Sequence, residues 1–208
     1  MIDLLRNAVA GLRPGLDVVE AYVDEDVQRP GLTSVLAGLE EAVVVPVLLS
    51  AGYHVHVDVT GAVAATGRPD IRAARALGPD HVLAAVLADR LAEAGAGDHA
   101  VVLGAAGSSD PRAAAGVEQV AEVLSAELGR HVTTAYATAR EPAIEDAVRV
   151  LHAAGRSVAI ACYLLAPGAF HDRLRTMGAE LVTAPLLPDS RIAELVLRRY
   201  DEALATAE

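Results

Sequence analysis

Apolar residues recur along the chain in short continuous runs that alternate with helical spacings. The runs are rich in valine, leucine and isoleucine, which is typical of strands buried on both faces of a sheet. They predict strands over residues 16–23, 43–48, 71–77, 100–103, 132–136, 157–164 and 180–184. Amphipathic segments between them predict helices over residues 2–12, 31–41, 58–65, 80–94, 111–128 and 142–152, from about residue 170, and over 188–204. This alternation predicts an α/β fold, with parallel sheets flanked by helices.

The pattern runs twice along the chain. Residues 95–98 (Gly-Ala-Gly-Asp) are the best boundary, so we predict two domains, at residues 1–95 and 98–208. Short motifs recur in both at offsets near 110 residues, the size of one small α/β unit. The matches are Ala21-Tyr22 with Ala135-Tyr136, Pro30 with Pro142, Leu48-Leu49 with Leu164-Leu165, and Leu77 to Asp80 with Leu186 to Asp189. We therefore expect an internal duplication.

The repeat also shows a difference between the two units. The second unit begins with a strand and a glycine-rich turn over residues 99–116, whereas Met1 aligns near Val117, inside the first helix of the unit. We therefore expect the first domain to lack its first strand. Two explanations stay open, a shortened sequence and a domain that evolved without the strand, and we favour the first.

Composition narrows the function classes. The net charge of -11 leaves no basic stripe for nucleic-acid binding. The N-terminus has neither a basic region nor a long apolar stretch, and no apolar run is long enough for a membrane span. The single cysteine, Cys162, lies in an apolar run and is interpreted as an inert core residue. We expect a cytoplasmic protein of 208 residues with a sizeable core.

The first candidate site follows the apolar run at residues 43–48. His54 and His56 are two residues apart, so they share a face if the strand continues through them. Neutral imidazole binds divalent iron, cobalt, nickel or zinc, and it also serves as a base. Asp58 either orients one of the rings or caps a helix. A loop with two solvated histidines is the alternative interpretation.

The second candidate site is the turn that precedes the helix at residues 111–128. Gly107 permits a tight turn, and Ser108 and Ser109 stand before Asp110-Pro111, so backbone N–H groups there are able to hold a carboxylate or phosphate. Arg112 adds a positive charge. Plain helix capping explains the same residues. Neither a GxGxxG nor a Walker motif occurs, which disfavours a nucleotide site.

Four segments together resemble a known family, the long, internally duplicated sirohydrochlorin chelatases, which are class II tetrapyrrole chelatases. The segments are PVLLSAGYHVHVDV at 46–59, LGPD at 77–80, GSSDP at 107–111 and YLLAPGAF at 163–170. The resemblance covers nearly the whole chain. It implies two tandem chelatase-like domains, the first without its first strand.

The resemblance also implies a function and a site. Members insert Co²⁺ or Fe²⁺ into sirohydrochlorin, on the way to cobalamin or sirohaem, with no cofactor beyond the divalent metal substrate. One family histidine maps onto His54, which is implied as catalytic residue and metal ligand, with His56 as a second ligand. Tyr53 and Asp58, together with Gly107, Ser108, Ser109 and Arg112, are implied in substrate binding.

The sequence departs from the family pattern at two places. The second family histidine lies in a His-Gly turn after the first strand, and this sequence contains no such turn. A glutamate that some members place before a proline is Arg29 in the first unit and Glu141 in the second. The alternative function is therefore a non-catalytic tetrapyrrole- or metal-binding protein. The expected partner is a polycarboxylate tetrapyrrole, and the chain is expected to be a monomer with two pseudo-symmetric domains or a homo-oligomer.

Overall fold

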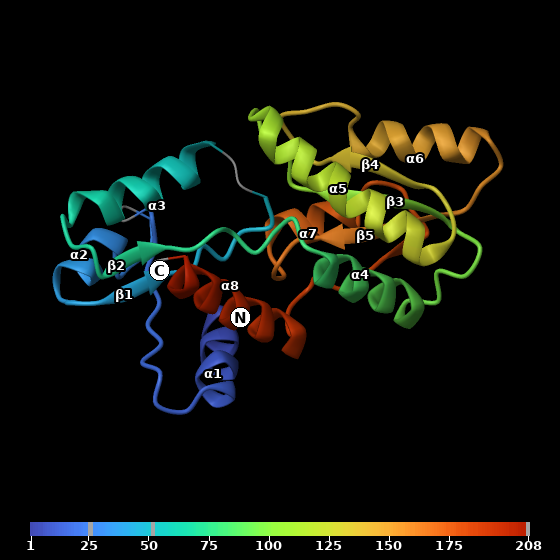
Figure 1. Cartoon of the computed structure of the whole chain (residues 1–208). Helices are drawn as coiled ribbons and strands as arrows, with labels where there is room; N and C mark the ends of the chain where they lie inside the picture. The colour runs from blue at the N-terminus through green and yellow to red at the C-terminus, as the bar shows by residue number, and fades with distance from the viewer. Residues whose placement is uncertain (25–26, 51–52, 207–208) are drawn as a thin grey trace.

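The computed structural model describes residues 1–24, 27–50 and 53–206, with the backbone alone at residues 53–56. Two parallel sheets lie side by side along the molecule, each accompanied by helices (Figure 1). In the first half the elements are α1 (Ile2–Leu12), α2 (Leu32–Ala37), β1 (Ala42–Val44), α3 (Tyr53–Ala65), β2 (Ile71–Ala73) and α4 (His81–Glu93). In the second half they are β3 (Ala100–Ala105), α5 (Pro111–Leu128), β4 (Val132–Tyr136), α6 (Ile144–Ala153), β5 (Val158–Tyr163), α7 (Ala169–Leu174), β6 (Leu181–Val182) and α8 (Ser190–Ala205).

The second half is built on a parallel sheet with the strand order β4-β3-β5-β6. Successive side chains of a strand point to opposite faces, and the core follows this alternation. Val101 and Leu103 of β3 pack toward α4, α5 and α8, whereas Val102 packs toward α6 and α7. Every residue of β3 and β5 is buried, as the continuous apolar runs predicted.

Cys162 lies in β5 and is fully buried, which confirms its interpretation as a core residue. Burial raises the pKa of its thiol to about 12, so the sulfur stays protonated at neutral pH. A protonated, buried thiol is neither a nucleophile nor a metal ligand.

The first half has a smaller sheet in which β1 pairs in parallel with β2. These two strands correspond to β5 and β6 of the second half, and Tyr22 takes the place of Tyr136 at the end of β4. Among the described residues of the first half, no strand occupies the position that β3 holds in the second. The fold is thus the expected duplicated α/β arrangement, in which the described first half has no counterpart of β3.

The duplication is visible in backbone hydrogen bonds. The Tyr22 N–H donates to the Pro30 carbonyl at 2.9 Å, and the Tyr136 N–H donates to the Pro142 carbonyl at 3.0 Å. Both tyrosines make an isolated parallel bridge to the residue after that proline. The two units therefore share their loop geometry as well as their order of elements. The domain limits at residues 1–95 and 98–208 stay a prediction.

The last helix of each half packs on the opposite half. Helix α4 lies against α5 and β5, and its buried leucines join the core of the second half. Helix α8 lies against α1 and β1 in the first half (Figure 1). We call this arrangement the helix exchange. The chain crosses between the two halves twice, at the turns that precede α4 and α8.

Several predicted elements differ from the structure. The predicted strand at residues 16–23 is wrong: only Tyr22 makes a bridge, because the described first half offers the rest of this segment no neighbouring strand. Strand β1 ends at Val44, before Pro46, which has no N–H to donate to a ladder. The predicted helix at 31–41 ends at Ala37, and the one predicted from residue 58 begins at Tyr53.

No helix in the described ranges combines the length and the apolar character that crossing a bilayer requires.

Candidate functional site

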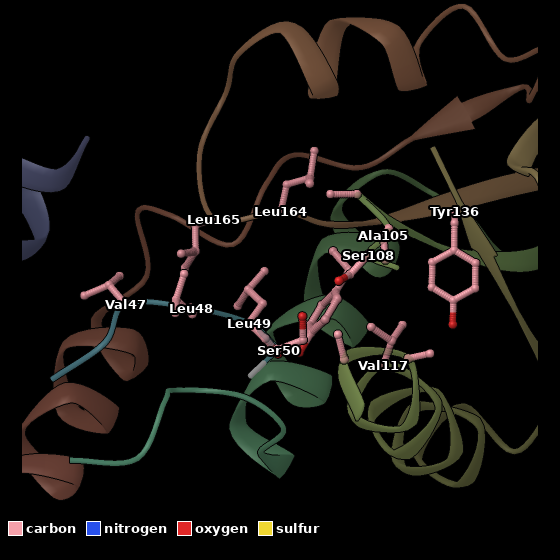
Figure 2. Close-up of a pocket in the computed structure, with 15 residues that line it drawn as sticks. Val47, Leu48, Leu49, Ser50, Ala105, Ser108, Val117, Tyr136, Leu164 and Leu165 are labelled. Atoms are coloured by element: carbon pink, nitrogen blue, oxygen red, sulfur yellow. Dashed lines mark hydrogen bonds between the residues drawn. The ribbon is translucent and has the colours of Figure 1, made fainter. Parts of the chain in front are cut away.

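A cavity of ≈ 200 Å³ lies where the two halves meet (Figure 2). Strands β3, β4 and β5 end at it, and the strand order reverses between β3 and β5. In open parallel sheets, ligands bind outside the carboxyl ends of the strands at such a reversal. The first half contributes Val47 to Ser50, and the second contributes Ala105 to Ser108, Ala113, Ala114, Val117, Tyr136 and Tyr163 to Leu165.

The lining of the cavity is largely apolar. Leu48 and Leu49 from the first half lie across from Leu164 and Leu165, their matches in the internal repeat (Figure 2). Small residues at the end of β3 and the start of α5 leave space between these pairs. Such a surface suits part of a flat, apolar ring system better than a compact polar metabolite.

The turn after β3 forms one wall of the cavity. Gly107 has a φ of 95°, and a Cβ atom there would stand 1.9 Å from the Thr138 carbonyl oxygen, so only glycine fits. The Ser108 hydroxyl accepts a hydrogen bond from the Asp110 N–H at 3.1 Å. Asp110 caps α5 by accepting from the Arg112 N–H at 2.9 Å. The turn thus caps helix α5, as the capping interpretation of the sequence predicted, and Gly107 and Ser108 line the cavity.

Tyr136 places a buried hydroxyl in this apolar lining. Its side chain is buried, and its hydroxyl makes no hydrogen bond of ordinary geometry with another described residue. Burial raises the pKa of Tyr136, although the neighbouring Arg140 lowers it in part, so the phenol keeps its proton and remains a donor. The Arg140 guanidinium lies over the ring, 5.9 Å from its centroid.

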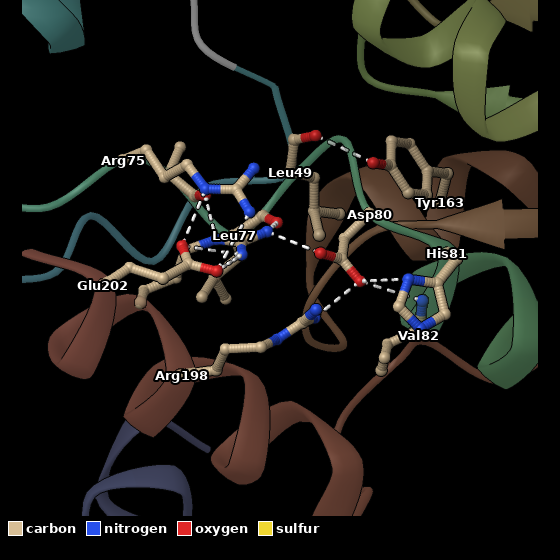
Figure 3. A network of polar contacts seen from close by, with 11 residues as sticks. Leu49, Arg75, Leu77, Asp80, His81, Val82, Tyr163, Arg198 and Glu202 are labelled. Carbon is tan, nitrogen blue, oxygen red and sulfur yellow. Dashed lines mark hydrogen bonds and ion pairs between the residues drawn. The ribbon is translucent and has the colours of Figure 1, made fainter. Parts of the chain in front are cut away.

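A buried ion pair holds the connection to α4, and Figure 3 shows its carboxylate residue, Asp80, within a network of polar contacts. The Arg199 side chain, from α8, is 0% exposed and reaches Asp80 at 2.7 Å. It also donates to the carbonyls of Ala76 and Leu77, at 2.9 and 2.8 Å. Arg199 therefore holds the whole turn that precedes α4.

Asp80 is tied down from several directions. It accepts from the Val82 N–H at the start of α4 and from Arg198 as well as Arg199. Desolvation by burial raises the pKa of Asp80, but the Val82 N–H and the two guanidinium groups outweigh it, so the pKa lies below the ordinary value of 3.8. Asp80 is therefore a carboxylate in the folded protein at neutral pH.

The connection that leads into α8 is also held by an arginine that donates to backbone carbonyls. Arg90 in α4 donates to the carbonyls of Pro185 and Pro188, in the turn that precedes α8, at 3.3 and 2.9 Å. Arg90 and Arg199 occupy matching positions in the repeat, and each pairs with a glutamate three residues later. Each exchanged helix thus anchors the turn that leads into the other.

The histidine segment forms the first turn of α3. The prediction that His54 and His56 share a strand face required the strand to continue through them, and the backbone there is helical instead. Asp58 lies inside the helix and is exposed, so it is not the N-cap. The side chains of Tyr53, His54 and His56 lie outside the described part of the structure. Among the side chains that it describes, no three His, Cys, Asp or Glu residues gather as a metal ion would need.

A scan of protein-family models matches the CbiX model twice, over residues 1–94 and 100–203. The chain belongs to the CbiX family. The two matches cover the two units of the internal repeat, as the sequence resemblance implied. No curated protein sequence matches the chain.

Solved structures share the CbiX-type fold over almost the whole chain. SirB from Bacillus subtilis with Fe³⁺ has a TM-score of 0.83 at 20% identity, covering 99% of this chain and 89% of that one. The sirohydrochlorin chelatase SirB from Bacillus subtilis subspecies spizizenii, in complex with cobalt, has a TM-score of 0.71 at 17% identity, with coverages of 97% and 88%. A structure of CbiX, described as the terminal enzyme of sirohaem biosynthesis in denitrifying bacteria, has a TM-score of 0.73 at 21% identity, with coverages of 97% and 90%.

The structure brings together some of the predicted site residues. Gly107 and Ser108 line the cavity, whereas Ser109 and Arg112 are exposed outside its lining. Arg112 pairs with Asp110 at 3.0 Å. Of the positions related to the family glutamate, Arg29 is exposed, and Glu141 accepts from the Ala143 N–H at 2.9 Å.

Sequence reasoning missed both tyrosines of the cavity and the Asp80–Arg199 pair. The internal repeat could have indicated the cavity, because it matches Leu48-Leu49 with Leu164-Leu165, and both pairs line it. The partners of Tyr163 and Arg199 include backbone carbonyls far away in the sequence, for which no motif exists.

We predict that Arg199→Met destabilises the protein strongly. The substitution leaves the buried Asp80 carboxylate with fewer partners, and breaking a buried ion pair costs about 3–5 kcal/mol. Chemical denaturation at neutral pH measures the loss. The control is Arg13→Met, which removes the exposed pair that also ties α8 to the first half, Arg13–Asp201 at 2.5 Å, and should cost about 0.2–1 kcal/mol. Equal losses would contradict a special role for the buried pair.

The contribution of Asp80 should depend on pH. Because its pKa is lowered on folding, the carboxylate stabilises the native state fully above its unfolded pKa, and this stabilisation is lost as the pH falls through the folded value. The stability difference between the wild type and Asp80→Asn should therefore be constant near neutrality and shrink below about pH 4. Denaturation at a series of pH values tests this, and a difference that persists unchanged to pH 3 would refute it.

Tyr136→Phe should leave stability unchanged or raise it slightly. The substitution removes a buried hydroxyl that makes no hydrogen bond of ordinary geometry in the described structure, and an unpaired buried hydroxyl costs about 1–3 kcal/mol. Thermal unfolding of the two proteins measures the change. A loss of more than about 1 kcal/mol would show that the hydroxyl has a partner that stabilises the fold.

Proposed function

We propose that this chain is a sirohydrochlorin chelatase, which inserts Co²⁺ or Fe²⁺ into the tetrapyrrole. The observation that carries the proposal is the CbiX match over both units, on a chain whose apolar cavity adjoins the segment leading to His54. The related structures with Fe³⁺ and with cobalt support a metal substrate. We propose that the reaction belongs to the synthesis of either sirohaem or cobalamin. We also propose that the protein acts in the cytoplasm.

Metal insertion makes modest chemical demands. A divalent ion enters the macrocycle, two pyrrole N–H protons leave, and the oxidation state of the metal does not change. The site must hold the ion, accept protons and keep the ring in place. Neutral imidazole both binds divalent cobalt or iron and accepts protons.

We assign the metal-handling role to His54, with His56 as an accessory ligand. Position 54 is in the first turn of α3, four residues after Ser50, which lines the cavity. An ion held there would lie beside a ring bound in the cavity. No cofactor beyond the metal substrate enters this proposal.

The ring itself is larger than the cavity, so we propose that only one edge of it enters. The leucine pairs would contact that edge, and the turn at Gly107 and Ser108 would offer hydrogen bonds to a peripheral carboxylate. Tyr53, Asp58, Ser109 and Arg112 are proposed to contact the parts of the substrate that remain outside. The chain would act as a monomer or as a homo-oligomer with one such site per copy.

A second function has one observation in its favour. No His-Gly pair occurs anywhere in the sequence, so the second histidine of the family pattern is missing. The alternative is a protein that binds the tetrapyrrole or the metal without turnover. The two functions differ in whether one chain metallates many substrate molecules.

His54→Ala should lower kcat for metal insertion by about 10²–10⁴-fold, the usual contribution of a general base. The loss of sirohydrochlorin absorbance on addition of Co²⁺ measures the rate. His131→Ala is the matched control, since His131 is exposed and outside the cavity lining, and its rate should equal that of the wild type. An unchanged rate in His54→Ala would overturn the assignment of His54.

A further inference from the structure

Residues 45–50, the described part of the segment between β1 and α3, have no sheet partner. After β1 ends at Val44, residues 45–50 run to the cavity outside any ladder. Within the segment, the Leu48 N–H donates to the Pro46 carbonyl at 2.9 Å. Its position against the rest of the protein therefore depends on the side chains of Val45, Val47 and Leu49, which pack against the core, and on the contacts that its carbonyls make.

Tyr163 supplies one of these contacts from the other half of the molecule (Figure 3). Its hydroxyl donates to the Leu49 carbonyl at 2.7 Å, between residues 114 positions apart. The side chain is 2% exposed, at the end of β5 in the middle of the second sheet. Burial raises the pKa of Tyr163, so the hydroxyl remains a donor throughout the physiological range.

Gly78 supplies the second contact, from the turn that precedes α4. Its N–H donates to the Leu48 carbonyl at 3.0 Å. A Cβ atom on Gly78 would stand 2.0 Å from the Leu49 oxygen and 2.9 Å from the Tyr163 hydroxyl, so the three groups are packed as closely as glycine permits. The Leu49 carbonyl is thus enclosed between Tyr163 and Gly78.

Both contacts come from rigid surroundings. Tyr163 is the last residue of a strand with neighbours on both sides, and the Gly78 turn is held by Arg199 through the Leu77 carbonyl. The repeat places Val47 at the position that matches Tyr163, and valine has no hydroxyl to donate. The first half therefore makes no equivalent hydrogen bond to the second half, and only the segment that continues to His54 is held in this way.

We propose that Tyr163 is a positioning residue for the His54 segment. Its hydroxyl fixes the Leu49 carbonyl against the end of β5 and so sets where the chain enters α3. The proposal rests on the proposed role of His54 in holding the metal. Small misplacements of a reacting group are costly, so a fixed entry point matters for metal delivery.

The test is Tyr163→Phe in the full chain, which keeps the buried ring and removes only the hydroxyl. Amide hydrogen exchange of the peptides that cover residues 45–58 should become about five- to tenfold faster, as expected for one lost hydrogen bond. Exchange in β3 should stay unchanged, which separates local loosening from general destabilisation. Co²⁺ affinity, measured by titration calorimetry without tetrapyrrole, should fall by a similar factor of about five to ten.

Tyr200→Phe is the matched control. Tyr200 lies in α8 with Arg13 over its ring, 5.6 Å from the centroid, and away from the cavity lining. The same atom is removed, and both exchange at residues 45–58 and Co²⁺ affinity should equal those of the wild type.

The outcomes separate this proposal from the proposed function. If Tyr163→Phe leaves either the exchange at residues 45–58 or the Co²⁺ affinity at the wild-type value, the positioning role of Tyr163 is wrong while the chelatase proposal stands. If the wild type itself binds no Co²⁺, the proposed role of His54 fails, and the positioning role fails with it. Faster exchange together with weaker Co²⁺ binding in Tyr163→Phe alone supports the proposal.

Discussion

The buried pair between Arg199 and Asp80 is the constraint on which the rest of the structure depends. A guanidinium without solvent contact is costly, and here it is compensated by a carboxylate and two backbone carbonyls. These partners all belong to the turn that precedes α4, whereas Arg199 lies in α8. The pair therefore fixes the point where the two exchanged helices pass each other.

From this turn the constraint continues to the cavity. Gly78 follows Leu77, which Arg199 holds, and it bonds the carbonyl of Leu48. Leu49 is held in turn by Tyr163, from the end of β5. The wall that the first half gives to the cavity is thus positioned in part by the second half, directly by Tyr163 and, through the Leu77 carbonyl, by Arg199. The helix exchange therefore makes the site a property of both units together.

Duplication explains the form of the cavity, and divergence explains its asymmetry. Matching leucine pairs from the two units lie across from each other, so the apolar surface has a pseudo-twofold character. The polar groups do not follow this symmetry: Tyr163 has valine as its match, and the turn at Gly107 has no counterpart among the described residues of the first half. A ring bound between the leucines would therefore meet different chemistry on its two sides.

Much of this organisation could be predicted from the sequence. The apolar runs of β3 and β5, the duplication and the turn at Gly107 and Ser108 between a strand and a helix all follow from local pattern. The strand predicted at residues 16–23 does not form, because strand formation requires a neighbour that the described first half does not offer. Residues 53–57 belong to α3 although their β-branched and aromatic character favours a strand.

The site was less predictable than the fold because its decisive contacts are long-range. Arg199 looks like an ordinary surface charge on an amphipathic helix, and only the exchange of α8 buries it. Ser109 and Arg112 carry the residue types of an anion site but lie exposed outside the cavity lining, on either side of Asp110, which caps α5.

The most direct test of the account is the number of metal ions that one chain inserts. Excess sirohydrochlorin and Co²⁺, or Fe²⁺ under anaerobic conditions, are mixed with a small amount of the protein, and metallation is followed by absorbance. A sirohydrochlorin chelatase should make many turnovers per chain, at a rate well above that of the same mixture without protein. Conversion that stops at one equivalent of protein, or a spectral shift without any metal-dependent conversion, would contradict catalysis and identify a binding protein.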